Sequence, residues 1–257
     1  MTKAGNRARL DLLAAIEAAA VRGWPALETR QIDGWLARCT SGGSVRANSV
    51  AALAWSGTDI DAAISAVEQF YDAHGAPSVF TISEASLPVG LDARLAECGY
   101  AHRGDHVTMG KTVDRSIAAP MAARIAETFD EGWLAVYLSG LSADRRDAAP
   151  GILRRLPPAS YVSVRRDGRV IASGLSIIDG DLASVQCMAT LPEARRTGAA
   201  SAVLAAIEHH AAAAGARHLY LQTDAGNIAA QELYRRAGYD IVGRYHTRVR
   251  APRGTEP

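Results

Sequence analysis

The chain has 257 residues and a mass of 27.1 kDa, which is enough for one large domain or two small ones. Its 28 basic and 27 acidic residues nearly cancel, so no general field would attract nucleic acid or an acidic membrane. The 3 cysteines are too few, and odd in number, for a disulfide framework, and no apolar run approaches the length of a membrane span. We therefore expect a globular protein of the cytoplasm, with no nucleic-acid or membrane partner.

The N-terminal segment 10–21 is apolar and follows basic residues, as the core of a signal peptide does. Asp11 and Glu17 interrupt the apolar run, and the resulting pattern is more typical of an amphipathic helix on the protein surface. We therefore predict a surface helix here.

The rest of the first half alternates β-like runs with helical segments. Its predicted elements, in chain order, are a strand over 34–39, a helix that begins within 56–61, a strand over 78–83, and a strand over 102–111 that follows Gly99-Tyr100. The glycine-rich segment 40–50 is predicted to be a hairpin turn, although Arg46 and the polar residues around it could instead reach the cleft of a second domain.

Residues 113–119, with Pro120 after them, are predicted to be a linker. The predicted elements of the second half, in chain order, are a helix over 130–137, strands over 173–178 and 182–190, a helix that runs to about Ala214, a strand over 216–224, a helix from Asn227 to Gly238, and a strand over 240–250. Trp133 and Tyr137 lie four residues apart on the first of these helices and so share one face. We expect them in the core rather than at a binding site.

Small residues lie where strand 182–190 turns into the following helix. The motif is Arg195-x-x-Gly198-x-Ala200. A helix start has unpaired backbone N–H groups and the positive end of the helix dipole, so it suits a diphosphate. Gly198 and Ala200 would let phosphate oxygens approach the backbone, which larger side chains would block. An ordinary strand-to-helix turn is the alternative interpretation.

The segment after this helix carries two further polar residues at a defined spacing. Asn227 is a good helix N-cap, Tyr234 follows it by seven residues, and Gly238 is a plausible helix stop. Because seven residues make about two helical turns, Asn227 and Tyr234 share one face.

The order of these features resembles the second half of a GNAT acetyltransferase domain. In that family a Gln/Arg-x-x-Gly-x-Gly/Ala loop binds acyl-CoA, and the resemblance covers residues 160 to 250. It implies that the loop binds the diphosphate, mostly through backbone N–H groups, and that the preceding strand contacts the thioester. It also implies a general acid at Tyr234 and a pantetheine contact at Asn227, which could also be a simple N-cap. The implied acetyl-CoA site comprises Met188, Ala189, Thr190, Arg195, Arg196, Thr197, Gly198, Ala199, Ala200, Ser201 and Asn227.

The general base is less evident than the general acid. Many members of this family have a Glu on the strand before the loop, but Gln186 stands where an acid might. The base could be Asp224 at the end of the next strand, a water held by Gln186 or Gln222, or a group from the first domain. No metal site is expected, because the 7 histidines show no ligand spacing and the adjacent His209 and His210 point in different directions on a helix. Cys187 is interpreted as a small buried side chain rather than as a nucleophile.

The sequence also contains an internal repeat. The two Gly-Tyr pairs are separated by 238 − 99 = 139 positions, and the preceding strands align at the same offset without a gap. A single repeat at this spacing suggests duplicated domains rather than a solenoid. We predict an α/β (α+β) fold of two GNAT-like domains, each with a mixed, mostly antiparallel twisted sheet flanked by helices. The predicted bounds are 1–112 for a degenerate copy, 113–119 for the linker, 120–250 for the acetyl-CoA-binding copy and 251–257 for a flexible tail.

The two copies differ at the positions that correspond to the implied diphosphate loop and to the implied general acid. At an offset of 139, Gly198 aligns with Asp59, Ala200 with Asp61, and Tyr234 with Leu95. Two carboxylates at a helix start would repel a diphosphate, and leucine has no proton to give. We therefore predict one acetyl-CoA site per chain, in the second copy.

The resemblance implies an acetyl-CoA-dependent N-acetyltransferase that acts on a primary amine of a small molecule by direct attack on the thioester. A non-catalytic acyl-CoA-binding or regulatory protein is the alternative. Transfer of an aminoacyl group from tRNA on the same fold is disfavoured by the near-neutral charge. The expected partner is the small-molecule amine, and both a monomer and a homodimer are compatible with the sequence.

Overall fold

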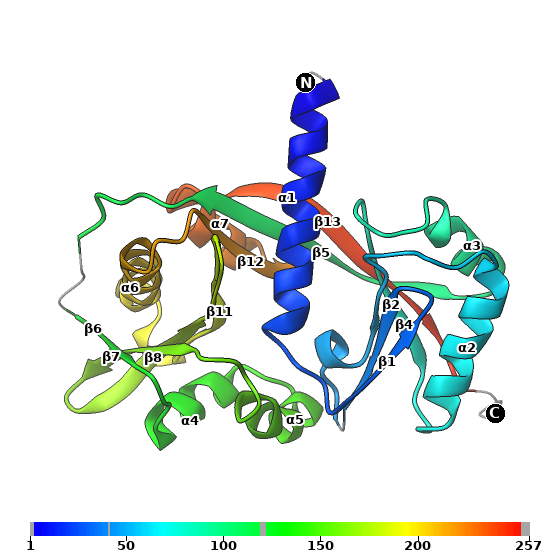
Figure 1. The fold of residues 1–257 in the computed structure, drawn as a ribbon. Coiled ribbons are helices and arrows are strands. Elements are labelled where there is room, and N and C mark those ends of the chain that lie inside the picture. The colour runs from blue at the N-terminus through cyan, green and yellow to red at the C-terminus, as the bar shows by residue number, and fades with distance from the viewer. Residues whose placement is uncertain (1–2, 41, 119–121, 253–257) are drawn as a thin grey trace. The chain divides into compact units, whose positions relative to one another are not determined.

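The computed structural model describes residues 3–40, 42–118 and 122–252, which form two compact units (Figure 1). Unit 1 holds the described residues up to 107 together with 224–226 and 242–252, and unit 2 holds the others. Ala119 of the predicted linker and residues 253–257 of the predicted tail lie outside the described residues. The domain bounds inferred from the sequence stay predictions, since each unit includes a segment from the other half of the chain.

Unit 1 is built on one mixed sheet. Its strands follow the order β1-β2-β3-β4-β13-β5, in which β3 and β4 run parallel, while β1 with β2, β2 with β3, and β4 with β13 are antiparallel. The elements are α1 (Lys3–Arg22), β1 (Glu28–Ile32), β2 (Trp35–Cys39), a short 3₁₀ turn η1 (Val45–Ala47), β3 (Val50–Ala51), α2 (Ile60–Asp72), β4 (Ser78–Ser83), α3 (Leu91–Glu97), and most of β5 (Ala101–Thr112) and of β13 (Asp240–Arg250).

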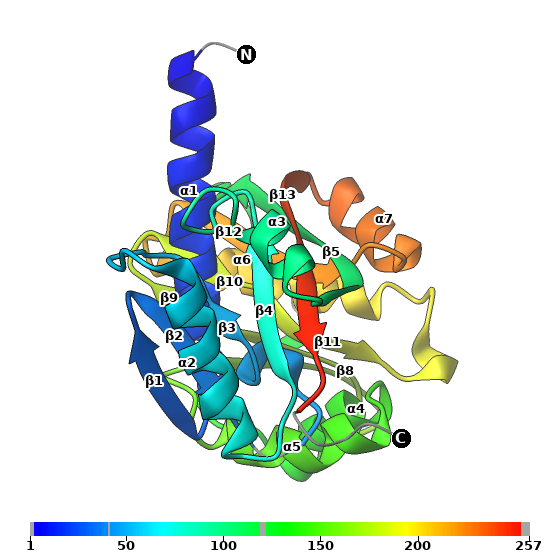
Figure 2. The same ribbon diagram turned by 90° about the vertical axis from the view of Figure 1, so that its right-hand side faces the viewer.

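The core of unit 1 lies between α2 and the sheet (Figure 2). The helix buries Ile64, Val67 and Tyr71, whose spacing places them on one face. They pack in the same cluster as Trp35 and Phe80, whose rings meet edge to face at 5.4 Å.

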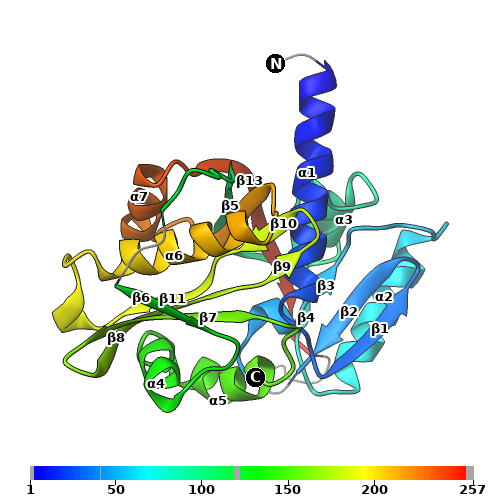
Figure 3. The ribbon, with the colours of Figure 1, turned by 60° about the vertical axis from the view of Figure 1, so that its left-hand side comes forward.

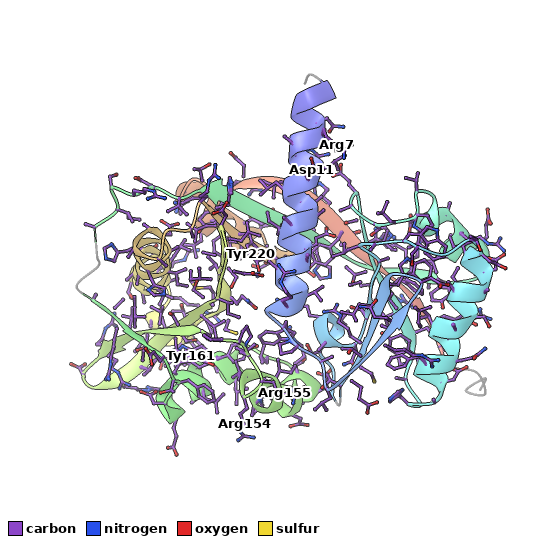
Figure 4. The ribbon with its side chains drawn as sticks, in the orientation of Figure 1. Arg7, Asp11, Arg154, Arg155, Tyr161 and Tyr220 are labelled. Carbon is purple, nitrogen blue, oxygen red and sulfur yellow. The ribbon has the colours of Figure 1, made fainter. Side chains whose placement is uncertain are left out.

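The N-terminal helix α1 is less exposed than its sequence pattern predicts. Its outer part fits the prediction, because Arg7 and Asp11 form an exposed ion pair (Figure 4). Glu17, however, retains only 8% of its exposed area, and Leu13 and Ile16 are buried beside it. The predicted helix is present and its outer part is exposed, but Glu17 lies on its buried face although it interrupts the apolar run.

The glycine-rich segment 40–50 joins the antiparallel strands β2 and β3, as predicted for a hairpin connection. Its Arg46 lies 4.8 Å from the centroid of the Trp24 ring, also in unit 1. Ser41 of this segment lies outside the described residues.

Unit 2 contains two sheets. One follows the order β11-β8-β7-β6 and is antiparallel throughout, and in the other β12 pairs with β10 in parallel and β10 pairs with β9. The elements are β6 (Ala123–Ala126), α4 (Glu131–Ser139), α5 (Ala143–Leu153), β7 (Ser160–Arg166), β8 (Arg169–Ser176), β9 (Ile178–Asp179), β10 (Leu182–Ser184), β11 (Gln186–Thr190), η2 (Pro192–Ala194), α6 (Ala199–Ala213), β12 (His218–Asp224) and α7 (Ile228–Arg236).

Helices cover both faces of the four-stranded sheet in unit 2, with α4 and α5 on one face and α6 on the other (Figure 3). Strand β8 is therefore buried along nearly its whole length. On the α4 face, the Trp133 indole is 2% exposed and donates to the Val162 and Gly174 carbonyls at 3.0 Å each. This confirms the prediction that Trp133 belongs to the core.

The elements of the two halves recur at the offset found in the sequence. Helices α2 and α6 begin at Ile60 and Ala199, and strands β5 and β13 begin at Ala101 and Asp240, so both pairs are 139 residues apart. Among the described residues, no helix is both long enough and apolar enough to span a membrane.

Gly174 lies at a close approach of β8 to Val203 on α6 and to Met188 on β11. A Cβ atom here would lie 2.5 Å from Val203 Cγ1 and 2.8 Å from Met188 Sδ. We expect Gly174→Ala to lower the free energy of unfolding by about 1–3 kcal/mol because the added methyl overpacks this layer, as measured by urea denaturation.

Gly140→Ala is the matched control for that prediction. Gly140 has a right-handed helical backbone, and the nearest atom to an added Cβ is 3.9 Å away. Its unfolding free energy should stay within about 0.5 kcal/mol of the parent value. Equal effects of the two substitutions would contradict the packing described for Gly174.

Candidate functional site

The candidate site begins where the apolar run 182–190 changes sheets. Sequence analysis predicts one strand here, but the structure divides it at Val185 into β10 and β11. The first part pairs with β12, and Val185 N–H donates to the Tyr220 carbonyl at 2.8 Å just after that ladder. From Gln186 onward the chain pairs with β8 instead. Strands β11 and β12 therefore separate, which the sequence could not show.

An irregularity in β11 accompanies this separation. The pairing with β8 shifts register by one residue between Gln186 and Ala189, and Cys187 has a left-handed backbone with φ of 52°. Leu191 N–H donates to the Ile171 carbonyl on β8 at 3.0 Å. Because backbone groups alternate sides along a strand, the N–H of Thr190 points away from β8, toward the open edge of this sheet.

The loop after β11 has a left-handed backbone at two places. Arg196 has φ of 60° and Gly198 has φ of 85°, both in the left-handed region. Glycine takes this conformation without steric cost, whereas Arg196 must be held there by its surroundings. A Cβ atom on Gly198 would meet no atom within 4 Å, so the space in front of this position is open.

Helix α6 presents free backbone donors to that space. Its first internal bond runs from Ala202 N–H to the Gly198 carbonyl at 2.9 Å, so the N–H groups of Ala199, Ala200 and Ser201 have no partner within the helix. Gly198 as N-cap supplies no side-chain cap. Arg195, Arg196, Thr197 and Ser201 are exposed, Ala200 is half-buried and Ala199 is buried.

Two arginines of the β7–β8 hairpin join this loop, and sequence reasoning missed both. Arg166 Nη2 donates to Thr197 Oγ1 at 3.1 Å, and Thr197 Oγ1 in turn donates to the Ala194 carbonyl at 2.8 Å. Arg169 lies 3.2 Å from Glu193 in an exposed ion pair. The Asp167-Gly168 sequence between these arginines predicts a hairpin turn. It does not predict which part of the protein the tip of that hairpin contacts.

Asn227 is the N-cap of α7. Its Oδ1 accepts a hydrogen bond from Ala230 N–H at 3.1 Å, and the side chain is exposed. This confirms the N-cap role predicted from the sequence. The pantetheine contact implied by the resemblance stays a prediction.

Tyr234 is buried on α7, with 6% of its area exposed. Its ring meets that of Tyr239 edge to face at 5.8 Å, and burial raises the pKa of Tyr234 to about 12. The phenol therefore keeps its proton throughout the range in which proteins are usually studied. Tyr239 in turn lies under the ammonium group of Lys111, which forms a buried ion pair with Glu208 at 2.9 Å.

The candidates for a general base lie in different surroundings. Asp224 is exposed, and its Oδ1 accepts from Gly226 N–H at 2.7 Å in the turn after β12. Gln186 is 7% exposed, and its amide Nε2 donates to Ser184 Oγ at 2.9 Å. These bonds describe a turn residue and a buried polar pair, and the identity of the base stays a prediction.

The two adjacent histidines have separate partners. His209 Nδ1 lies 3.0 Å from the Ile117 carbonyl, and His210 Nε2 lies 2.8 Å from Ser160 Oγ. Burial lowers the pKa of His210. Among the described residues, no group of three or more His, Cys, Asp or Glu side chains could hold a metal ion.

Comparison with known proteins identifies the family of this chain. The family model described as probable histone acetyltransferase Rv0428c C-terminal matches residues 13–250. The chain is 29% identical over 254 residues to an uncharacterized N-acetyltransferase, YobR, of Bacillus subtilis, and this covers 94% of the chain and 100% of that protein.

Solved structures agree on the fold. A GCN5-related N-acetyltransferase from Kribbella flavida superposes with a TM-score of 0.67 at 17% identity, covering 92% of this chain and 94% of the other. A tandem GNAT protein from the clavulanic acid biosynthesis pathway superposes with a TM-score of 0.58 at 14% identity, covering 76% of this chain and 70% of the other. The chain has the α/β fold of the GNAT acyltransferases, and it belongs to the Rv0428c C-terminal acetyltransferase family.

The Asn227 cap can be separated from any ligand contact. We expect Asn227→Ala to lower the free energy of unfolding by about 1 kcal/mol, because the N-terminus of α7 loses the acceptor for Ala230 N–H. Asn227→Asp keeps an acceptor oxygen at the same place, so its stability should remain near the parent value. Thermal denaturation of the three proteins checks this, and equal loss in both variants would contradict the capping role.

Proposed function

We propose that the chain is an acetyl-CoA-dependent N-acetyltransferase, in which a primary amine of a small molecule attacks the thioester directly. The observation that carries the proposal is the edge of β11, which leaves β12 at Val185 and leads into a loop whose helix N–H groups are free. The edge of β11 could supply the N–H donors that a thioester carbonyl needs, and the loop at the start of α6 could supply those that a diphosphate needs.

The loop has the chemistry that a diphosphate requires. The N–H groups of Ala199, Ala200 and Ser201 start a helix of 15 residues, and the open space at Gly198 lets an oxyanion approach them. Arg195 and Arg196 supply exposed positive charge, and Arg166 adds a third cation beside Thr197. The described loop therefore fits the co-substrate that the family implies.

The open edge of β11 would hold the thioester carbonyl. Thr190 N–H points to that edge, next to Met188 and Ala189. Acetyl-CoA supplies an activated acyl group there, and a fixed N–H donor stabilises the negative charge that develops on the carbonyl oxygen during attack.

Tyr234 would donate a proton to the departing thiolate. Its pKa of about 12 keeps the phenol protonated, and its buried position excludes competing water. Asp224 remains our candidate for receiving the proton of the amine, because it is an exposed carboxylate at the end of β12.

A non-catalytic acyl-CoA-binding protein is the second candidate. It is favoured by one observation: Gln186 occupies the place on β11 where a carboxylate base would be useful, and its amide is bonded to Ser184. Release of the CoA thiol across a panel of amines distinguishes the two functions. Tight acetyl-CoA binding without turnover on any amine would favour the binding protein.

The size of the acceptor needs a separate test, because the description of the matched family names histones. We propose a small-molecule amine that is acetylated in the cytoplasm. Small primary amines and lysine-containing histone peptides should be compared at equal amine concentration. Turnover of the peptides alone would contradict a small-molecule acceptor.

Tyr234→Phe tests the general acid. The substitution removes the proton and keeps the ring that packs on Tyr239. We expect kcat to fall by about 10²–10⁴-fold, while the Kd for acetyl-CoA changes little. Because the pKa of Tyr234 is raised, kcat of the parent enzyme should show no loss from ionisation of this phenol up to pH 9.5.

Tyr220→Phe is a matched control for this substitution. Tyr220 is also buried in unit 2 but lies on β12 (Figure 4), where it pairs in the ladder with Ser184. Its loss should leave kcat within a few-fold of the parent value. An unchanged kcat in Tyr234→Phe would exclude the acid role.

Gly198→Asp tests the diphosphate loop, because it copies the residue found at the N-cap of α2. We expect acetyl-CoA binding to fall below detection by isothermal titration calorimetry, since a carboxylate would face the diphosphate and also cap the free N–H groups.

Gly198→Asn separates charge from shape. Asparagine has nearly the same size as aspartate and tolerates the left-handed backbone, and the position has room for a side chain. It should bind acetyl-CoA more tightly than the aspartate variant. Normal binding by Gly198→Asp would show that the loop is not the diphosphate site.

A further inference from the structure

Helix α1 is pressed against strand β13 within unit 1. A Cβ atom on Gly243 would lie 2.4 Å from Leu13 Cδ1, so only a glycine allows this approach. Glu17 follows Leu13 by four residues and therefore lies on the same face of the helix, toward the sheet. The carboxylate is thus held against β4 and β13 rather than in solvent.

Only half of the Glu17 carboxylate has a partner there. Oε2 accepts a hydrogen bond from Ser83 Oγ at 2.8 Å, whereas Oε1 is buried and accepts none from the described residues. The side chain is 8% exposed, and burial raises the pKa of Glu17 to about 7. A buried carboxylate oxygen without a donor is unfavourable, so a ligand that supplies an N–H would be favoured at this place.

Aromatic and charged groups lie near Glu17 or near Tyr245, the ladder partner of Ser83. Ser83 pairs directly with Tyr245 across the β4–β13 ladder, and the Tyr245 ring stacks on the His106 ring at 4.7 Å. The charged groups near Glu17 or Tyr245 are Glu84, which is paired with Arg9, together with Asp224 and Arg46. Arg46 lies over Trp24. Burial, and then the negative charges of Glu17 and Asp224, raise the pKa of the Tyr245 phenol.

We propose that Glu17, Ser83, Tyr245 and Asp224 of unit 1 form a binding site for a primary ammonium group. An ammonium has three N–H donors and positive charge, which match an unpartnered carboxylate oxygen, a second carboxylate and an aromatic ring. The ligand class is a small alkylamine. Asp224 is also our candidate base for acetyl transfer, so this inference shares that residue with the proposed function. The test below measures amine binding alone, without acetyl-CoA, so its failure is distinguishable from a failure of acetyl transfer.

The pH dependence of this site follows from the Glu17 carboxyl. Above pH 7 the carboxylate is charged and attracts the ammonium, and below pH 7 it is protonated and loses that attraction. The alkylamine stays protonated throughout this range. Affinity should therefore rise about tenfold from pH 6 to pH 8 if binding requires the ionised form.

The test uses the full chain and n-butylammonium chloride in an amine-free buffer, measured by isothermal titration calorimetry. The parent protein should bind n-butylammonium about tenfold more tightly at pH 8 than at pH 6. Glu17→Gln should weaken binding at pH 8 by at least about tenfold and remove the pH dependence. Glu84→Gln, a neighbouring carboxylate with 48% of its side chain exposed, should bind as the parent does.

A second measurement keeps the proposal testable if Glu17→Gln fails to fold. The carbon-13 shift of the Glu17 carboxyl, followed by NMR, should titrate near pH 7, and added n-butylammonium should lower that midpoint. Tetramethylammonium, which has no N–H donor, should bind more weakly. No binding of n-butylammonium at pH 8, equal binding by Glu17→Gln, or equal binding of tetramethylammonium would overturn the proposal.

Discussion

The candidate site depends on one interruption of backbone pairing. Val185 N–H donates to the Tyr220 carbonyl on β12, and from Gln186 the chain pairs with β8. If this segment paired with both β12 and β8, the N–H groups on both of its edges would be bonded to neighbouring strands. Because β11 changes sheets, one of its edges is an edge of the four-stranded sheet and can bind a ligand. The loop that follows β11 leads directly to the free N–H groups at the start of α6. The left-handed residue Cys187 is the local signature of that change.

The two copies of the repeat use the same helix start in opposite ways. Asp59 accepts from the N–H groups of Asp61 and Ala62 at 3.0 and 3.1 Å, so α2 caps itself. Asp61 is occupied as well, because it pairs with Arg94 at 2.6 Å. At the equivalent position of α6, Gly198 caps nothing. One helix start is thus closed by its own side chains, and the other is open to an anion.

Local patterns carried most of the element assignments, and non-local contacts account for the failures. The Asn227 cap, the strand 240–250 and the offset of 139 residues depend on short-range chemistry, and the structure has all three. The break at Val185 was not predictable, because an apolar run looks the same whichever partner it pairs with. The buried face of α1 that carries Glu17 also carries Leu13, which packs closely on Gly243, more than two hundred residues away along the chain. The position of Arg166 beside Thr197 likewise depends on which loop its hairpin meets.

The exchange of chain segments between the units has a consequence for synthesis on the ribosome. Strand β4 of unit 1 pairs with β13 through six consecutive residue pairs, from Tyr245 with Ser83 to Arg250 with Ser78. The segment that completes unit 1 is therefore among the last to be translated. Domains at the N-terminus generally fold first as the chain emerges. In this protein one edge of β4 stays unpaired until β13 has been translated, when nearly the whole chain has been made. Unit 1 is therefore the first unit to begin synthesis, although its sheet cannot be completed until the end.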